Sequence, residues 1–125
     1  MIKTLLLVGL GGAIGSIFRY LTHWLTTKYF QNSFPLSTFF VNIIGSLLIG
    51  LFIGYIGKYF PENHPLKFFL IVGFCGGFTT FSSFALENYN LLQNNNQIIA
   101  YIYMSTSIIL TIFAVGFGSY LSKYL

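Results

Sequence analysis

The sequence predicts an all-α integral membrane protein in which a single domain, residues 1–125, contains four transmembrane helices. Only 6% of the residues are charged and 55% are hydrophobic, whereas about 25% of the residues in a soluble domain are charged. The mean hydropathy is +0.76. A bilayer core requires roughly 20 consecutive apolar helical residues to cross it, and the chain contains four stretches of that length. The expected surroundings of this protein are therefore lipid.

The four predicted helices lie near residues 4–25, 35–57, 66–90 and 98–121. Short joints rich in Pro, Asn and Gln separate them, so consecutive helices should be antiparallel neighbours. A closed β-barrel also satisfies backbone polar groups in lipid, but its strands alternate in polarity, and these unbroken apolar runs do not. The helical interpretation is therefore preferred.

The charges lie mostly at the ends of the apolar runs and give a formal net charge of +4. Four lysines fall on the side that carries both termini, against Lys28 and Arg19 on the other side. This gives a slight preference for cytoplasmic termini, and so weak a bias permits insertion in both orientations. No basic cluster could follow a phosphate backbone, so we expect no nucleic acid partner.

Small residues recur at packing spacing in the first two helices. Gly11 and Gly15 form one small-xxx-small pair, and Gly50 and Gly54 form another. Such pairs let helix backbones approach closely, either between subunits or within one bundle. Four helices do not easily enclose a polar pathway alone, so we expect an oligomer. Arg19 either extends to the lipid headgroups or faces a vestibule, where it would attract anions.

Polar residues follow one face of the second helix and one face of the fourth at four-residue spacing: Thr38, Asn42 and Ser46, and Tyr103, Ser107 and Thr111. Polar groups are costly in a membrane and are therefore candidates for function. Either stripe alone could only join helices by hydrogen bonds. Together they suggest the two walls of a polar track.

The third helix combines three glycines and four hydroxyl residues between Gly73 and Phe84. Glycines weaken a helix, so we expect a break near mid-membrane, buried within protein. Its freed carbonyls could ligate a cation or be capped by the Thr and Ser hydroxyls. The alternative is a straight helix with a glycine groove.

Phe81, Phe84 and Glu87 are spaced three residues apart and project to roughly one side of that helix. The edge of an aromatic ring is positive and would attract an anion without a fixed charge, which keeps binding weak enough for exit. Glu87 is the single acid within a predicted helix. It could be a proton-coupled carrier residue, a gate along the track, or an interfacial carboxylate.

The sequence gives no support for an enzyme. His23 and His64 lack partners at metal-ligand spacing. The single cysteine, Cys75, has no neighbouring base and permits no intramolecular disulfide. The glycines between residues 9 and 15 miss the dinucleotide-binding register by one residue and follow no strand.

Three segments together resemble the signature blocks of the Fluc (CrcB) family of fluoride channels: Gly11–Tyr20, Phe40–Ser46 and Gly73–Phe84. They occur in the family's order and at comparable spacing over nearly the whole chain. One departure is Ser82-Ser83, where the family pattern is Ser-Thr. The resemblance implies a fluoride-selective channel that passively exports fluoride across the plasma membrane and so lowers cytoplasmic fluoride. It also implies a dual-topology, antiparallel homodimer with two pores at the subunit interface.

The resemblance also implies roles for individual residues. Those expected to line the pore and bind fluoride are Phe81, Phe84, Asn42, Ser107, Tyr103 and Glu87. Arg19 matches the vestibule arginine of the family. The backbone carbonyls of Gly76 and Thr79, two from each subunit, would hold a structural sodium ion at the dimer centre.

Two other functions fit a chain of this size. A small four-helix proton-coupled multidrug exporter is also compact, but such carriers place their essential acid in the first helix, where this chain has none. A helical membrane scaffold without transport activity is the third candidate. A channel should give fast, uncoupled flux of one small anion, a carrier should give saturating, proton-coupled flux, and a scaffold should give none.

Overall fold

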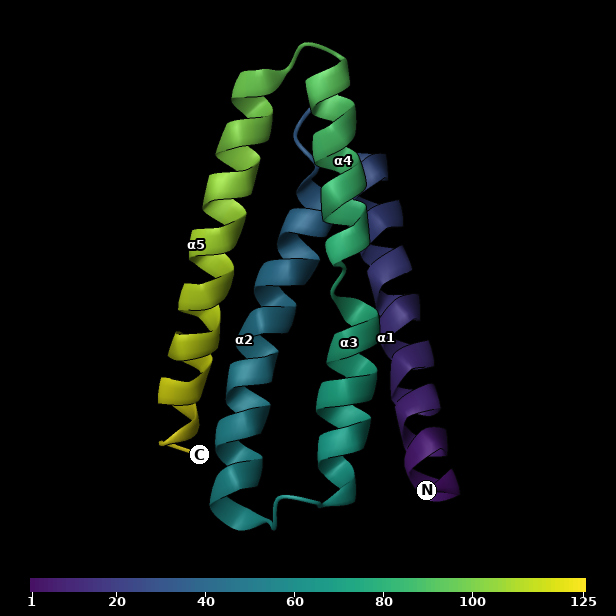
Figure 1. The fold of residues 1–125 in the computed structure, drawn as a ribbon, viewed down its shortest axis with the longest axis vertical. Coiled ribbons are helices and arrows are strands. Elements are labelled where there is room, and N and C mark those ends of the chain that lie inside the picture. The colour runs from purple at the N-terminus through teal and green to yellow at the C-terminus, as the bar shows by residue number, and fades with distance from the viewer.

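The computed structural model describes all 125 residues as four long helical segments, without a β-strand. The first two are α1 (Ile2–Tyr29) and α2 (Leu36–Tyr59), and the last is α5 (Gln97–Ser122). The third segment, Lys67–Gln93, consists of a π-helical stretch η1 (Lys67–Cys75), a single turn α3 (Gly76–Phe78) and a longer helix α4 (Phe81–Gln93). Consecutive segments run in opposite directions (Figure 1).

All four segments are long and apolar enough to cross a membrane. The predicted all-α class with four spanning segments is therefore confirmed. Each observed segment lies within four residues of its predicted bounds, because the apolar runs end where turn-forming residues begin. Pro35 directly precedes α2, where its missing N–H leaves no backbone donor unsatisfied.

A tight reversal joins α4 to α5. Asn95 is the only residue with a positive φ, 61°, a conformation that Asn tolerates better than most side chains. The Asn96 N–H donates to the carbonyl of Leu91 at 2.8 Å, and the Asn95 N–H donates to that of Leu92 at 3.4 Å. This pair of bonds is a Schellman motif, which satisfies the last carbonyls of α4.

Glycines allow the helices of one chain to touch at their backbones. A Cβ atom on Gly11 would overlap the carbonyl oxygen of Phe69, and one on Gly15 would overlap that of Phe74. Helix α1 is thus held against η1 and α3. A Cβ on Gly50 would similarly overlap α5. These glycines therefore pack within the bundle, which is the second of the two explanations that their spacing allows, and they give no support to an oligomer.

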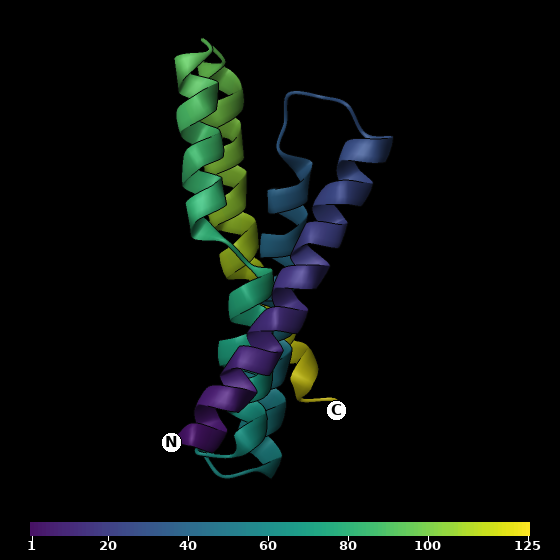
Figure 2. The ribbon, with the colours of Figure 1, turned by 90° about the vertical axis from the view of Figure 1, so that its right-hand side faces the viewer.

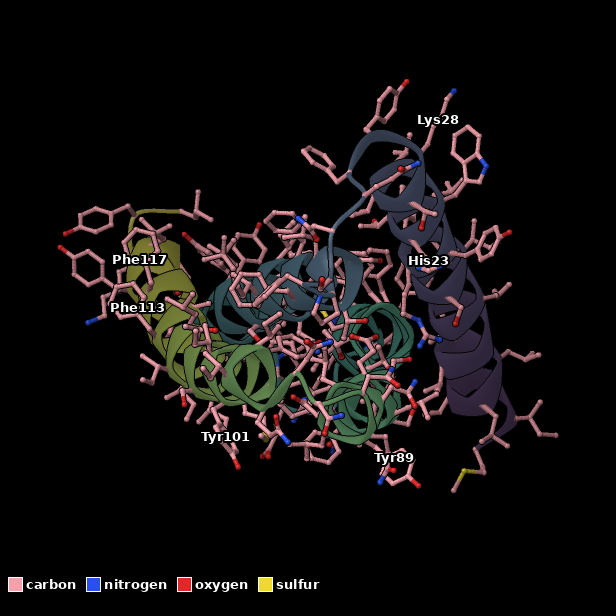
Figure 3. All side chains as sticks on the ribbon, turned by 90° about the horizontal axis from the view of Figure 1, so that it is seen from above. His23, Lys28, Tyr89, Tyr101, Phe113 and Phe117 are labelled. Carbon is pink, nitrogen blue, oxygen red and sulfur yellow. The ribbon has the colours of Figure 1, made fainter.

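The exterior of the molecule is strongly apolar. Only 19 of 125 residues are buried. Figure 3 shows Tyr89, Tyr101, Phe113 and Phe117 pointing away from the bundle, and all four are exposed. Such a surface is unusual for a soluble monomer and suits contact with lipid or with another subunit.

The two ends of the bundle differ in shape. Near the α1–α2 joint, α4 and the first half of α5 diverge from α1 (Figure 2). Near the termini, α1 stays against η1, and α2 packs along α5. The polar side chains that the sequence singles out lie toward the divergent end and beside the interruption between α3 and α4.

Candidate functional site

The third segment is interrupted at two residues. Helix α3 ends at Phe78, and α4 begins at Phe81. Between them Thr79 (φ −86°, ψ 157°) and Thr80 (φ −152°, ψ 118°) have extended backbone. The Thr80 hydroxyl accepts a hydrogen bond from the Ser83 N–H at 3.2 Å and so caps the first turn of α4.

Asn42 on α2 holds this interruption in place. Its side-chain oxygen accepts from the Thr80 N–H at 2.8 Å, and its side-chain nitrogen donates to the Thr80 carbonyl at 3.1 Å. One amide thus satisfies both backbone polar groups of a residue that is 8% exposed. An unsatisfied backbone group in a lipid environment costs several kcal/mol, so this pairing explains why the interruption is tolerated.

The interruption leaves the carbonyls of residues 76 to 79 without their helical donors. In a continuous helix the Thr80 N–H would bond to the Gly76 carbonyl, and the Ser83 N–H would bond to the Thr79 carbonyl. Here these two N–H groups donate to Asn42 and to the Thr80 hydroxyl. The carbonyls of Gly76 and Thr79 are the two that the resemblance assigns to sodium. Hard cations prefer such oxygen ligands.

A pocket of about 250 Å³ lies beside the interruption and collects most of the predicted site. Its walls come from α2, from the interruption, from α4 and from α5. Both polar stripes and the phenylalanine pair contribute to its lining. These predicted residues are Asn42, Ser46, Phe81, Phe84, Ser107 and Thr111. The two polar stripes therefore face each other across one pocket, although they lie on helices far apart in the sequence.

Two features of the pocket are relevant to an anion. The hydroxyl of Ser107, which is 6% exposed, has no hydrogen-bond partner, so its proton can point to a bound ion. The rings of Phe81 and Phe84 lie 5.6 Å apart. Phe84 is half-buried against Tyr103, while Phe81 is 79% exposed on the surface of the single chain.

Glu87 lies one helical turn beyond Phe84, between α2 and α5. Thr38 donates a hydrogen bond to one oxygen of its carboxylate, and the Tyr103 hydroxyl donates to the other at 3.0 Å. Thr38 and Tyr103 are the members of the two polar stripes that do not line the pocket beside the interruption. The stripes thus continue past that pocket and meet at Glu87.

Arg19 and Glu87 line a second pocket of about 300 Å³ between α1, α2 and α4. His23 and Thr38 line it as well, and they also line a neighbouring pocket of about 390 Å³ under the α1–α2 joint. Arg19 is half-buried. Arg19 thus lines a pocket within the bundle, and its assignment to a vestibule that attracts anions stays a prediction.

The structure brings Asn42, Phe81, Phe84 and Ser107 together in one pocket, and it joins Tyr103 to Glu87. Sequence reasoning did not assign a role to Thr80, although a Thr three residues before Ser83 at the start of a helix is a capping signal. It placed Thr38 on a polar stripe without identifying its partner. The pairing of Thr38 with Glu87 spans 49 residues, and no local pattern indicates it.

The fold and this site define a small multi-pass integral membrane protein with a pocket beside an interruption of its third segment. Residues 6–119 match the family model described as CrcB-like protein, Camphor Resistance (CrcB). The chain is 50% identical over 123 residues to the fluoride-specific ion channel FluC of Flavobacterium psychrophilum. The alignment covers 98% of this chain and 99% of that protein. A protein of the same name from Gloeothece citriformis is 48% identical over 119 residues, 95% of this chain and 96% of the relative.

A third relative with that name, from Azobacteroides pseudotrichonymphae, is 41% identical over 124 residues and covers 99% of both chains. The family model and these relatives together span nearly the whole sequence. The chain belongs to the CrcB family.

Proposed function

We propose that this protein is a fluoride-selective channel that passively exports fluoride across the plasma membrane and so protects the cell from fluoride. The names of the relatives support the ion, and the pocket beside the interruption supports the pathway. The observation that carries the proposal is the convergence of Phe81, Phe84 and the unpaired Ser107 hydroxyl on this pocket.

The chemistry of the pocket suits a small anion that must leave as easily as it enters. Fluoride is strongly hydrated, so the site must replace part of its water shell with donors. The Ser107 hydroxyl and the positive edges of two phenylalanine rings provide such donors without a fixed positive charge. A full charge in this low-dielectric setting would hold the ion too long for rapid conduction.

The direction of transport follows from acid–base chemistry and the membrane potential. Neutral HF crosses the membrane from acid surroundings and ionises in a near-neutral cytoplasm, where the anion is trapped. A membrane potential that is negative inside drives an anion outward by about 2.3 kcal/mol per 100 mV. Export therefore requires only a selective pore. Arg19 in the vestibule would raise the local concentration of fluoride.

The proposed assembly is an antiparallel, dual-topology homodimer with two pores. Phe81 lies on the surface of the single chain, 79% exposed, and a pore phenylalanine requires a second wall. A second copy in the opposite orientation would provide that wall and would give one pore for each chain. The slight imbalance of lysines at the two ends is compatible with insertion in both orientations.

The break in the third segment would then lie near mid-membrane, at the centre of the dimer. The carbonyls of Gly76 and Thr79 in each chain have lost their helical donors and fit a sodium ion as ligands. When bound there, the ion would neutralise the partial negative charge of the carbonyls of both chains and hold the two interruptions together.

The other candidates have less support. The relatives are named as ion channels, so neither an enzyme nor a multidrug exporter is favoured. The first helix contains no acid, where such an exporter requires one. The role of Glu87 is proposed to be that of a hydrogen-bonded carboxylate on the ion pathway rather than that of a proton carrier.

The proposal is tested by anion efflux from liposomes that contain the purified protein. A fluoride electrode records fluoride release, and a chloride electrode records release from matched liposomes. We expect rapid fluoride release without chloride release, and loss of fluoride release in Phe81→Ile. Phe113→Ile is the matched control, because Phe113 is also exposed and lines no pocket. If wild-type liposomes released neither ion, the proposal would be wrong.

A further inference from the structure

A separate pocket of about 220 Å³ lies beside the joint between α2 and η1. This joint is at the same end of the molecule as the two termini (Figure 1). Its apolar walls are formed by Ile53, Ile56, Phe60 and Ile71. Drug-sized ligands occupy pockets of about 300–1,000 Å³. This pocket is therefore suited to part of a larger amphipathic molecule, and no residue of the proposed ion pathway lines it.

Two opposite charges complete the lining. Glu62 and Lys67 are its only charged residues. Glu62 belongs to the joint between the two spans, and Lys67 is the first residue of η1. Both therefore lie at the ends of two spanning segments, where lipid headgroups are expected, while Ile53 lies about two turns deeper along α2. No salt bridge of 4.0 Å or less joins the carboxylate to the ammonium group, so each can pair with a ligand.

We infer that this pocket binds a phospholipid with a primary-amine headgroup, phosphatidylethanolamine. The Glu62 carboxylate would accept hydrogen bonds from the lipid ammonium, and Lys67 would pair with the lipid phosphate. The first carbons of an acyl chain would contact Ile53 and Ile56. The arrangement of opposite charges at the surface and apolar walls below matches the order of groups in this lipid. A choline headgroup cannot donate to Glu62, and a glycerol headgroup carries no positive charge.

A substitution at Gly57 tests the pocket directly. Gly57 lines the pocket, and a Cβ atom built on it would meet no atom within 4 Å. A larger side chain at this position therefore fits without displacing the backbone, and it would narrow the mouth of the pocket. Gly9 offers a matched control, because a Cβ there also meets nothing within 4 Å and Gly9 does not line the pocket.

The test is native mass spectrometry of the delipidated protein in detergent, titrated with palmitoyl-oleoyl phosphatidylethanolamine. The phosphatidylcholine and phosphatidylglycerol with the same acyl chains are titrated in parallel. We expect tighter binding of phosphatidylethanolamine than of either competitor. Gly57→Leu should weaken it by about tenfold or more, whereas Gly9→Leu should leave it unchanged. Elution of each variant from gel filtration at the wild-type volume verifies that it is folded.

Charge variants distinguish the two halves of the headgroup. Glu62→Gln should weaken phosphatidylethanolamine binding by about tenfold and remove the preference over phosphatidylglycerol. Lys67→Gln should weaken the binding of all three lipids, while Lys123→Gln, which changes the same charge outside the pocket, should not. Equal binding of the three lipids, or binding that Gly57→Leu does not alter, would overturn the inference. A shift of Gly57→Leu to the monomer without a change in lipid binding would assign the pocket to a subunit contact instead.

The inference does not depend on the ion that the protein conducts. Its measurement is lipid binding, and fluoride efflux is not part of it. If phosphatidylethanolamine bound as expected while liposomes released no fluoride, only the proposed channel function would be wrong.

Discussion

The two halves of the third segment are held by different forces. The half before the interruption, Lys67–Phe78, is apolar and rests against α1, where Gly11 and Gly15 let the backbones touch. The half after it, α4, packs chiefly against α5 and carries Glu87 in hydrogen bonds to hydroxyl groups. Backbone contact makes the first half an anchor, whereas the second half is held by side-chain contacts and carries the predicted site residues Phe81, Phe84 and Glu87. The first half is called the structural half below, and the second the functional half.

Asn42 holds the backbone between these halves by its hydrogen bonds to Thr80. Removing its side chain should have the largest effect on stability. Asn42→Ala leaves the N–H and the carbonyl of Thr80 without partners, and each orphaned group costs about 1–3 kcal/mol. We expect a large drop in the midpoint of thermal unfolding in detergent, together with faster hydrogen exchange at Thr80. Asn42→Asp keeps the acceptor but replaces the donor with a carboxyl group, which is costly within a membrane span, so this variant should lose stability as well. Equal stability of Asn42→Ala and the wild type would show that this backbone is held by other contacts.

The anchor half is probed at Gly15. In Gly15→Ala the new methyl group would overlap the carbonyl of Phe74, so α1 must move away from η1, at a cost of about 1–3 kcal/mol. Gly9→Ala is the control, since nothing lies within 4 Å of that position. It should stabilise α1 by up to about 1 kcal/mol through helix propensity. The two unfolding midpoints should therefore shift in opposite directions, and shifts in the same direction would contradict the close contact.

The start of the functional half depends on its cap. Thr80→Ala removes the acceptor for the Ser83 N–H and should cost about 1 kcal/mol, the usual value of an N-terminal cap. Thr80→Ser keeps the hydroxyl and should retain most of that stability. Hydrogen exchange resolved to the first turn of α4 measures the effect locally. Similar exchange at Ser83 in both variants would rule out the cap.

A smaller loss of stability is expected at Tyr103. Tyr103→Phe keeps the ring against Phe84 and removes only the donor to Glu87. Thr38 still donates to the other carboxylate oxygen, and Glu87 lines two open pockets from which water can replace the lost donor, so the cost should be about 0.5–1 kcal/mol of unfolding free energy. In liposomes we expect slower fluoride efflux that remains independent of a proton gradient. A proton-coupled flux in either protein would instead favour the carrier role for Glu87.

The sequence predicts the helices well and the contacts between them poorly. Apolar runs of membrane-spanning length, bounded by Pro and Asn, define the four segments without any tertiary information. The polar stripes identify Asn42 and Ser107, because a period of about four residues places polar groups on one helix face. The partners are not local properties, since Asn42 pairs with a residue 38 positions away. Whether the glycines contact another helix of the same chain or a second chain is likewise decided only by three-dimensional packing.

The exposure of Phe81 has the same origin. Its spacing with Phe84 predicts a shared face, but the other wall of that face is not part of a single chain. The π-helical winding of η1 has no signal in its apolar sequence that we can identify. Thr80 does carry a local signal, because a Thr directly before a helix is a common N-terminal cap. The glycines before it predict free carbonyls, but they do not indicate which group accepts from the Ser83 N–H.

Ser107 tests the division between structural and functional polar groups most directly. Its buried hydroxyl has no partner, so Ser107→Ala should be neutral or stabilising toward unfolding yet should reduce fluoride efflux from liposomes. The matched control is Ser122→Ala, which removes an equally buried hydroxyl that donates to the Ser119 carbonyl at 2.6 Å. That variant should lose stability and keep its efflux. Unchanged fluoride efflux in Ser107→Ala would contradict the assignment of this pocket to the ion pathway.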